Sequence, residues 1–254
     1  MKDLKQRVLR GDTLFGCFLH LASPITAEIM GLAGYDWALI DLEHGPGGEH
    51  EAIGQMQALE GTPAAAIVRV ESNARQRAHR VLDSGAYGVM FPRIDRADEA
   101  CAAVAAMRYP PDGVRGVAFS NRACAFGTNF RAYLEASKDT LLTVVQIETP
   151  EAVANVDAIA AVEGVDVLFV GPSDLSQSLG ILQQFDHPLY LGAIDRTAAA
   201  AARHGKRTGI LLPKPDDVEF YRKRGYTFLA SGSDGVLLNL AARALTAKLK
   251  DLAK

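Results

Sequence analysis

Three features of the 254-residue chain together predict an α/β fold of the (β/α)8 TIM-barrel class. Apolar, β-rich runs alternate with helical patterns eight times, which implies parallel strands joined by right-handed crossovers. Many of these runs are apolar on both faces, as strands covered by helices must be. The length suits one barrel of ~250 residues as well as it suits two small domains. Because no linker or low-complexity block divides the chain, we expect a single domain over residues 1–254.

Each expected element follows from its local pattern. The expected strands are 13–21, 37–43, 64–70, 88–94, 141–148, 165–170, 208–212 and 227–231. The expected helices that alternate with them are 26–33, 49–60, 74–84, 98–108, 150–162, 188–204, 216–224 and 236–252. Glycines after the helical runs support these boundaries, because a left-handed residue closes a helix at low cost. Pro150 and Pro188 suit a first helical turn, where no amide hydrogen is needed.

Composition and charge exclude several classes of protein. Hydrophobic residues make up 48% of the chain and charged residues 22%, so a large core is available and disorder is disfavoured. A net charge of −3 without a basic block disfavours nucleic-acid binding. Residues 1–7 lack the apolar run of a signal peptide, and no stretch approaches the ~20 apolar residues of a membrane span. We therefore expect a cytoplasmic protein with neither nucleic-acid nor membrane partners.

The segment 109–139 is longer than a helix-to-strand connection in a compact α/β unit requires. It contains Arg115, Arg122 and Arg131, and its pattern predicts a short helix over 128–137. An insertion of this kind can form a subunit interface, an active-site wall or a plain surface loop. We favour the interface.

The last expected helix is apolar on more than one face. Its apolar residues are Val236, Leu237, Leu238, Leu240, Ala241, Leu245, Leu249 and Leu252. A helix that is apolar almost all round needs burial on two sides. Closure of the barrel is one explanation, but we expect contact with a second subunit and hence a homo-oligomer.

Two carboxylates follow neighbouring strands of the predicted barrel, where reactive groups of this fold gather. Glu148 closes the fifth strand, and Asp174 lies on the turn 171–176 after the sixth. Carboxylate oxygens suit Mg²⁺ or Mn²⁺, and strands ~4.8 Å apart allow both residues to reach one ion. The sequence therefore predicts a metal site. The alternatives are a helix N-cap for Glu148 and a turn-stabilising side chain for Asp174.

Three further polar side chains belong to the same strand ends. Arg69 has a planar fork that matches a carboxylate or an enolate oxygen, although a structural ion pair would explain it equally well. Gln146 shares a barrel side with the acid two residues later and can hydrogen-bond substrate or metal-bound water. His44, with Asp41 and Glu43 beside it, is the acid/base candidate.

Five motifs resemble the HpcH/HpaI family of metal-dependent 2-oxo-acid aldolases, whose best-known activity is on 4-hydroxy-2-oxoheptanedioate. They are DLEHGP at 41–46, VRV at 68–70, LDSGA at 82–86, QIET at 146–149 and GPSDLS at 171–176. The likeness runs over most of the chain, with the motifs in order. It implies a (β/α)8 barrel, a divalent cation (Mg²⁺, Mn²⁺ or Co²⁺) and hexamers built as trimers of dimers that exchange the last helix.

The resemblance also implies roles for individual residues. Glu148 and Asp174 match the metal ligands, and Arg69 matches the residue that stabilises the enolate. His44 matches the acid/base histidine, which the family pairs with the position of Asp83. The expected substrate-binding residues are Arg69, Gln146, Ser173, Asp174 and Leu212.

The expected function is that of a class II aldolase. It joins or cleaves a carbon–carbon bond between an aldehyde and the enolate of pyruvate or of a substituted pyruvate such as hydroxypyruvate. A Schiff-base aldolase using Lys214, near the end of the seventh strand, is the nearest alternative. An acyl-CoA carbon–carbon lyase and a non-catalytic oxo-acid-binding barrel are the others. Residues 231–235 favour a helix cap over a phosphate site.

Overall fold

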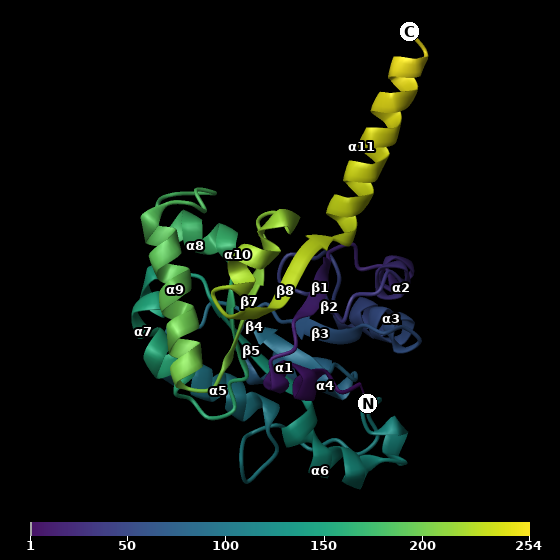
Figure 1. Ribbon diagram of the computed structural model, residues 1–254. Coiled ribbons are helices and arrows are strands. Elements are labelled where there is room, and N and C mark those ends of the chain that lie inside the picture. Colours follow the sequence, from purple (N-terminus) through teal and green to yellow (C-terminus); the bar gives the residue numbers. More distant parts are fainter. Residues whose placement is uncertain (1) are drawn as a thin grey trace.

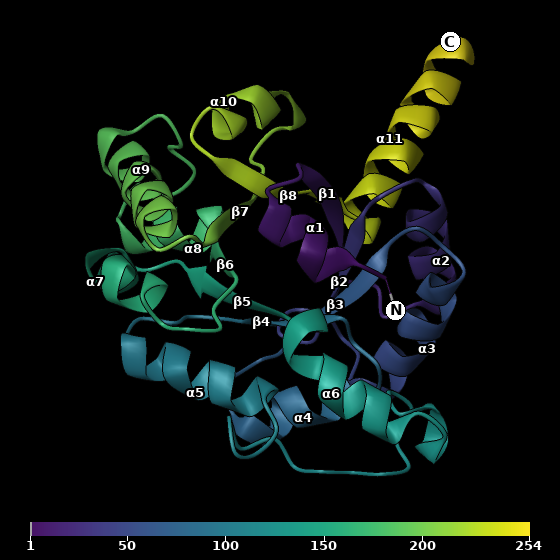
Figure 2. The same cartoon turned by 60° about the horizontal axis from the view of Figure 1, so that its bottom comes forward.

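The computed structural model describes residues 2–254 and contains a closed barrel of eight parallel strands in sequential order (Figures 1 and 2). The strands are β1 (Leu14–Leu19), β2 (Trp37–Asp41), β3 (Ala65–Arg69), β4 (Gly88–Phe91), β5 (Leu142–Ile147), β6 (Val167–Val170), β7 (Arg207–Leu211) and β8 (Tyr226–Ser233). The predicted barrel class is confirmed, and the strand boundaries differ from the predicted ones by at most three residues.

Helices surround the barrel. They are α1 (Leu4–Arg10), α2 (Pro24–Leu32), α3 (Glu49–Glu60), α4 (Arg75–Asp83), α5 (Ala97–Met107), α6 (Phe130–Thr140), α7 (Pro150–Ala160), α8 (Pro172–Ser178), α9 (Pro188–Arg203), α10 (Val218–Arg222) and α11 (Asp234–Leu252), with 3₁₀ turns η1 (Ala125–Gly127) and η2 (Pro215–Asp217). The prediction of eight helices missed the short α1 and α8. None of the helices within residues 2–254 is both long enough and apolar enough to span a membrane.

Aromatic side chains fill the interior of the barrel. The Trp37 indole stacks on Phe228 with ring centroids 4.1 Å apart, and Phe169 packs edge-on against both rings. A β-carbon at Gly16 would overlap the indole, so the strand opposite Trp37 needs a glycine. The helix α1 packs Leu4 into the same cluster from the N-terminal mouth. The barrel is therefore filled below its C-terminal end.

The segment 109–139 lies at the N-terminal end of the barrel, because α6 leads directly into β5 and contacts α1 (Figure 1). Its Arg115 is fully buried and donates hydrogen bonds to Asp83 at 2.8 Å and to the Tyr133 hydroxyl at 3.1 Å. The guanidinium also lies over the Tyr109 ring. The segment is therefore no wall of a site at the C-terminal end, and its role as an interface stays a prediction.

The terminal helix α11 projects away from the barrel, as Figure 1 shows. Asp234, its first residue, is its only buried one, so barrel closure alone does not explain its apolar character. Seven of its apolar side chains are at least 40% exposed: Val236, Leu237, Leu238, Leu240, Leu245, Leu249 and Leu252.

Candidate active site

A cavity of about 320 Å³ opens at the C-terminal end of the barrel. The ends of β1, β2, β3, β5, β6 and β7 contribute its walls, as expected for reactive groups in this fold. Its lining residues are Phe18, His20, His44, Arg69, Gln146, Phe169, Gly171, Pro172, Ser173, Asp174 and Leu211. The structure thus gathers five of the predicted site residues around one space.

A buried ion-pair network forms one wall of this cavity. Asp41 and Arg69 are register partners at the ends of β2 and β3. Arg69 donates from Nε to Asp41 Oδ1 at 2.9 Å and from Nη2 to Oδ2 at 2.6 Å, and its Nη1 lies 3.0 Å from Glu43 Oε2. Burial alone would raise the pKa of Asp41, but contacts with His20 and Arg69 hold it well below its usual range. Arg69 is therefore held rigidly by two acids.

Glu148 is a buried carboxylate that follows β5 directly. The backbone N–H of Arg93 donates to its Oε1 at 2.8 Å, and Gln146 donates from Nε2 to its Oε2 at 3.0 Å. Arg93 has a φ of 54°, a strained value for a residue other than glycine, and such strain clusters at functional sites. Thr149 caps α7 by accepting from the N–H of Ala152, so the helix-cap interpretation of Glu148 is wrong.

Glu148 and Asp174 both carry carboxylate oxygens, the donors that a hard divalent cation takes, and the charge of Asp174 acts on Glu148. Burial raises the pKa of Glu148 to about 7, and the charges of Asp174 and Glu43 act in the same direction. Such a raised pKa marks acids close together in a poorly hydrated place, where a cation between them would relieve the repulsion. Within residues 2–254, no group of three or more Asp, Glu, His or Cys side chains is arranged to hold a metal. Two protein carboxylates would leave the other coordination positions of the cation for water and substrate.

The backbone makes room for this pair at Gly171. A β-carbon there would lie 2.5 Å from Glu148 Oε2 and 3.4 Å from Gln146 Nε2. The glycine therefore allows the end of β6 to approach the carboxylate closely. Asp174 follows in the first turn of α8, and not on a free turn as expected from the sequence.

Two predicted site residues lie elsewhere. Leu212 packs in an apolar cluster between the strands and the outer helices, and Leu211 lines the cavity in its place. Asp83 ends α4, beside the N-terminal ends of the strands, and pairs with Arg115 at 2.8 Å. Within one chain, Asp83 does not orient His44.

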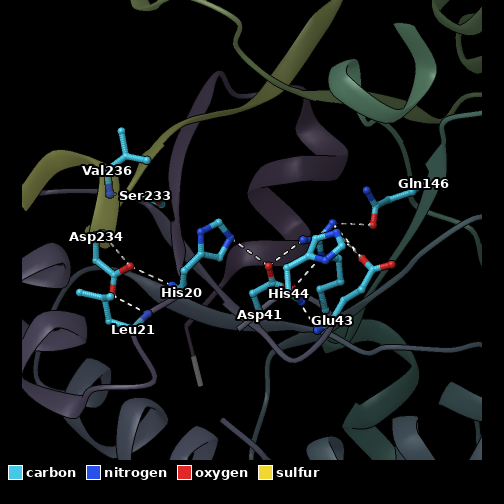
Figure 3. A network of polar contacts seen from close by, with 11 residues as sticks. His20, Leu21, Asp41, Glu43, His44, Gln146, Ser233, Asp234 and Val236 are labelled. Atoms are coloured by element: carbon cyan, nitrogen blue, oxygen red, sulfur yellow. Dashed lines mark hydrogen bonds and ion pairs between the residues drawn. The ribbon is translucent and has the colours of Figure 1, made fainter. Parts of the chain in front are cut away.

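His20 is the cavity residue whose contacts sequence reasoning missed. Its Nε2 lies 2.9 Å from Asp41 Oδ2, whereas the His44 ring is 62% exposed and its Nε2 is 3.9 Å from Glu43 Oε2 (Figure 3). The available signal was that His20 directly follows β1 and that Asp41 ends the adjacent strand β2.

Two alternatives lose support from the geometry. Lys214 lines a separate cavity of about 530 Å³ with Asp186, Asp217 and Phe220. The cavity that holds Arg69 has no lysine among its lining residues, which disfavours a Schiff-base aldolase. The Ser233 hydroxyl accepts from the N–H of Val236 and caps α11. This contact supports the helix-cap interpretation of residues 231–235 over a phosphate site.

Comparison with known proteins agrees with this geometry. The sequence pattern of the HpcH/HpaI aldolase/citrate lyase family matches residues 14–241. The 5-keto-4-deoxy-D-glucarate aldolase of Salmonella paratyphi C (strain RKS4594) is 47% identical over 240 residues, which cover 94% of this chain and 91% of that protein.

Solved structures give the same result. An HpcH/HpaI aldolase/citrate lyase family protein from Burkholderia cenocepacia J2315 superposes with a TM-score of 0.93 at 37% identity, covering 98% of this chain and 100% of that one. The HpcH/HpaI aldolase from Desulfitobacterium hafniense DCB-2 gives a TM-score of 0.92 at 28% identity, covering 98% and 97%. The protein is thus an enzyme of the carbon–carbon lyase class, and the chain belongs to the HpcH/HpaI aldolase/citrate lyase family.

Proposed function

We propose that the protein is a class II aldolase that depends on Mg²⁺, Mn²⁺ or Co²⁺. It joins or cleaves the bond between an aldehyde and the enolate of pyruvate or of a substituted pyruvate. The observation that carries the proposal is the single cavity in which Arg69, Gln146 and Asp174 converge, with Glu148 behind them. Its volume of about 320 Å³ suits a small oxo acid.

Glu148 and Asp174 would hold the divalent cation, which supplies a Lewis acid for the carboxylate and keto oxygens of the substrate. Gln146 orients Glu148 through the 3.0 Å hydrogen bond between Nε2 and Oε2. The Gln146 Oε1 in turn accepts from Arg69 Nη1 at 3.5 Å. The amide therefore joins the acidic and the basic parts of the cavity.

Arg69 stabilises the negative charge that develops on the keto oxygen. Its side chain is 7% exposed and its guanidinium is fixed by Asp41 and Glu43, so little reorganisation is needed when charge appears. Ser173 lines the cavity beside Asp174, and we propose that both contact the substrate, with Leu211 in place of Leu212.

His44 lines the same cavity, and we propose that it moves a proton to or from the aldehyde-derived hydroxyl, as the family resemblance implies. Since Asp83 of the same chain pairs with Arg115, orientation of His44 by this position requires Asp83 of a second copy. The exposed apolar side of α11 supports a homo-oligomer, and we propose a hexamer built as a trimer of dimers that exchange this helix.

The substrate class follows from the relative in Salmonella paratyphi C, which is named for 5-keto-4-deoxy-D-glucarate. We propose this hydroxylated oxo acid as the first compound to assay. The test measures pyruvate release from it and from other 4-hydroxy-2-oxo acids with Mn²⁺ present. Loss of activity with a chelator and no inactivation by borohydride are expected. Activity that survives chelation, or a borohydride-trapped adduct on Lys214, would overturn the proposal.

A further inference from the structure

We propose that the loop between β4 and α5, residues 92–96, holds Glu148 in the orientation that binds the cation, and that Asp95 is the positioning residue that keeps this loop in place. The inference rests on the proposed metal-dependent function. Asp95 lies outside the five sequence motifs and does not line the cavity that contains Arg69. Its role is therefore to act on Glu148 through the backbone of the loop.

The backbone of the β4–α5 loop contacts the end of β5 at two consecutive residues. The N–H of Arg93 donates to Glu148 Oε1 at 2.8 Å, and the N–H of Ile94 donates to the carbonyl oxygen of Gln146 at 3.2 Å. Gln146 Nε2 donates to the other carboxylate oxygen of Glu148 at 3.0 Å. Each carboxylate oxygen has two lone pairs, so each keeps one for a cation. The two donors therefore orient Glu148 and leave it able to bind a metal.

The contact from Arg93 requires an unfavourable backbone conformation. The φ of Arg93 is 54°, a value that residues with a β-carbon rarely adopt. Such a conformation persists only where the surrounding contacts impose it. Because φ relates the N–H of a residue to the chain that follows it, relaxation at Arg93 would turn this N–H away from Glu148. The orientation of Glu148 therefore depends on whatever holds the loop.

Asp95 joins the loop to the chain that follows Glu148. Its Oδ1 accepts from the Thr149 hydroxyl, and its carbonyl oxygen accepts from Asn155 Nδ2 at 2.9 Å. Thr149 is buried and directly follows Glu148. The Thr149 hydroxyl also accepts from the N–H of Ala152 at 3.0 Å, so it is tied to the first turn of α7. Asp95 thus fixes the loop against the start of α7, two residues after the strained Arg93.

A contact within the next helix completes the loop. Glu99 Oε2 accepts from the N–H of Asp95 at 2.8 Å and from the N–H of Arg96 at 3.1 Å. This carboxylate belongs to the first turn of α5 and holds the far end of the loop. The loop is therefore bonded to α5 on one side and, through Asp95, to α7 on the other.

The first test is Asp95→Ala, which removes the acceptor for the Thr149 hydroxyl. We expect the affinity for Mn²⁺, measured calorimetrically, to fall by ~10-fold or more, as is usual when a partner of a metal ligand is lost. In the metal-free protein, hydrogen exchange of the Arg93 and Ile94 amides should become faster. Asp95→Asn keeps an acceptor oxygen and should resemble the wild type. Asn155→Ala removes the bond to the Asp95 carbonyl oxygen and serves as a second variant, with changes in the same direction expected.

A rescue experiment separates this role from a purely structural one. Glycine adopts a φ near 54° without the cost that a β-carbon imposes. Adding Arg93→Gly to Asp95→Ala should therefore recover most of the Mn²⁺ affinity and the slow amide exchange. Adding Arg93→Ala removes the same guanidinium but keeps a β-carbon, so it should recover neither. A residue that only stabilised the fold would show no such difference between glycine and alanine.

The matched control is Asp98→Ala, because the Asp98 side chain is 72% exposed and pairs with Arg96 at 3.2 Å. This control should keep the wild-type Mn²⁺ affinity. Wild-type affinity in Asp95→Ala, or equal recovery with glycine and alanine at residue 93, would overturn the role of the loop. A wild-type protein that binds none of the three cations, while its amide exchange changes as expected in the variants, would instead overturn the proposed function and leave the hold of the loop on Glu148 standing.

Discussion

The substitution Gly171→Ala tests how closely the site depends on the position of Glu148. A β-carbon at residue 171 would lie 2.5 Å from Glu148 Oε2 and 3.3 Å from its Cβ, whereas ordinary contacts begin at 3.4 Å. The φ of Gly171 is −87°, which alanine adopts without strain, so the backbone itself tolerates the change. The perturbation therefore acts on the carboxylate.

The expected magnitude follows from the overlap. Restoring a 3.4 Å contact from 2.5 Å moves the Glu148 oxygen by about 0.9 Å, and it disturbs the 3.0 Å hydrogen bond from Gln146. A displacement of ~1 Å at a reacting centre costs ~10²-fold in rate, or ~2.7 kcal/mol of activation free energy. We expect kcat/KM to fall by about this factor, and the affinity for Mn²⁺ to fall with it.

The assay is steady-state pyruvate release, with a calorimetric Mn²⁺ titration of the same variant. Gly192→Ala on α9 is the matched control, because no atom lies within 4 Å of a β-carbon built there. That control should keep both quantities and gain up to ~1 kcal/mol of stability from helix propensity. A Gly171→Ala enzyme with wild-type kcat/KM and wild-type Mn²⁺ affinity would refute the reasoning.

Four further predictions concern the cavity, the terminal helix and the inserted segment. Arg69→Ala should lower kcat by ~10²-fold or more, with partial recovery in Arg69→Lys; full turnover in the alanine variant would exclude the assigned role. Because the pKa of Glu148 is raised to about 7, Mn²⁺ affinity should fall about tenfold for each pH unit below 7. Leu245→Glu should reduce the mass measured by light scattering, and an unchanged oligomer would count against assembly through α11. Asp83→Asn should lower the free energy of unfolding by ~3 kcal/mol, because the fully buried Arg115 loses its carboxylate, and denaturant titration measures the change.

The parts of the site that lie at strand ends could be predicted from the sequence. Glu148 directly follows the β-rich run 141–147, and Asp41 and Arg69 each end an apolar run, so one rule places all three at the same mouth. The contact between Asp41 and Arg69 follows from the strand register, because β2 and β3 pair these two residues directly.

The remaining features depend on details that periodicity does not contain. The strand β7 spans Arg207–Leu211, one residue earlier than predicted, and a shift of one residue moves a side chain to the other face, so Leu211 replaced Leu212. Asp83 pairs with Arg115 across 32 residues of sequence, a contact that the inserted segment creates and that local pattern cannot reveal. The contact of Asp234 with His20 spans more than 200 residues and depends on closure of the barrel.

The place of Asp234 bears on how the projecting helix can be shortened. This first residue of α11 accepts from the N–H groups of His20 and Leu21, in the loop between β1 and α2, and from the Thr26 hydroxyl in the first turn of α2. Truncation immediately before it would disturb subunit association and the chemistry of the cavity together, so loss of turnover would have two causes. Truncation after the first turn keeps the acceptors and removes most of the exposed leucines, which makes it the cleaner way to ask whether a monomer is active.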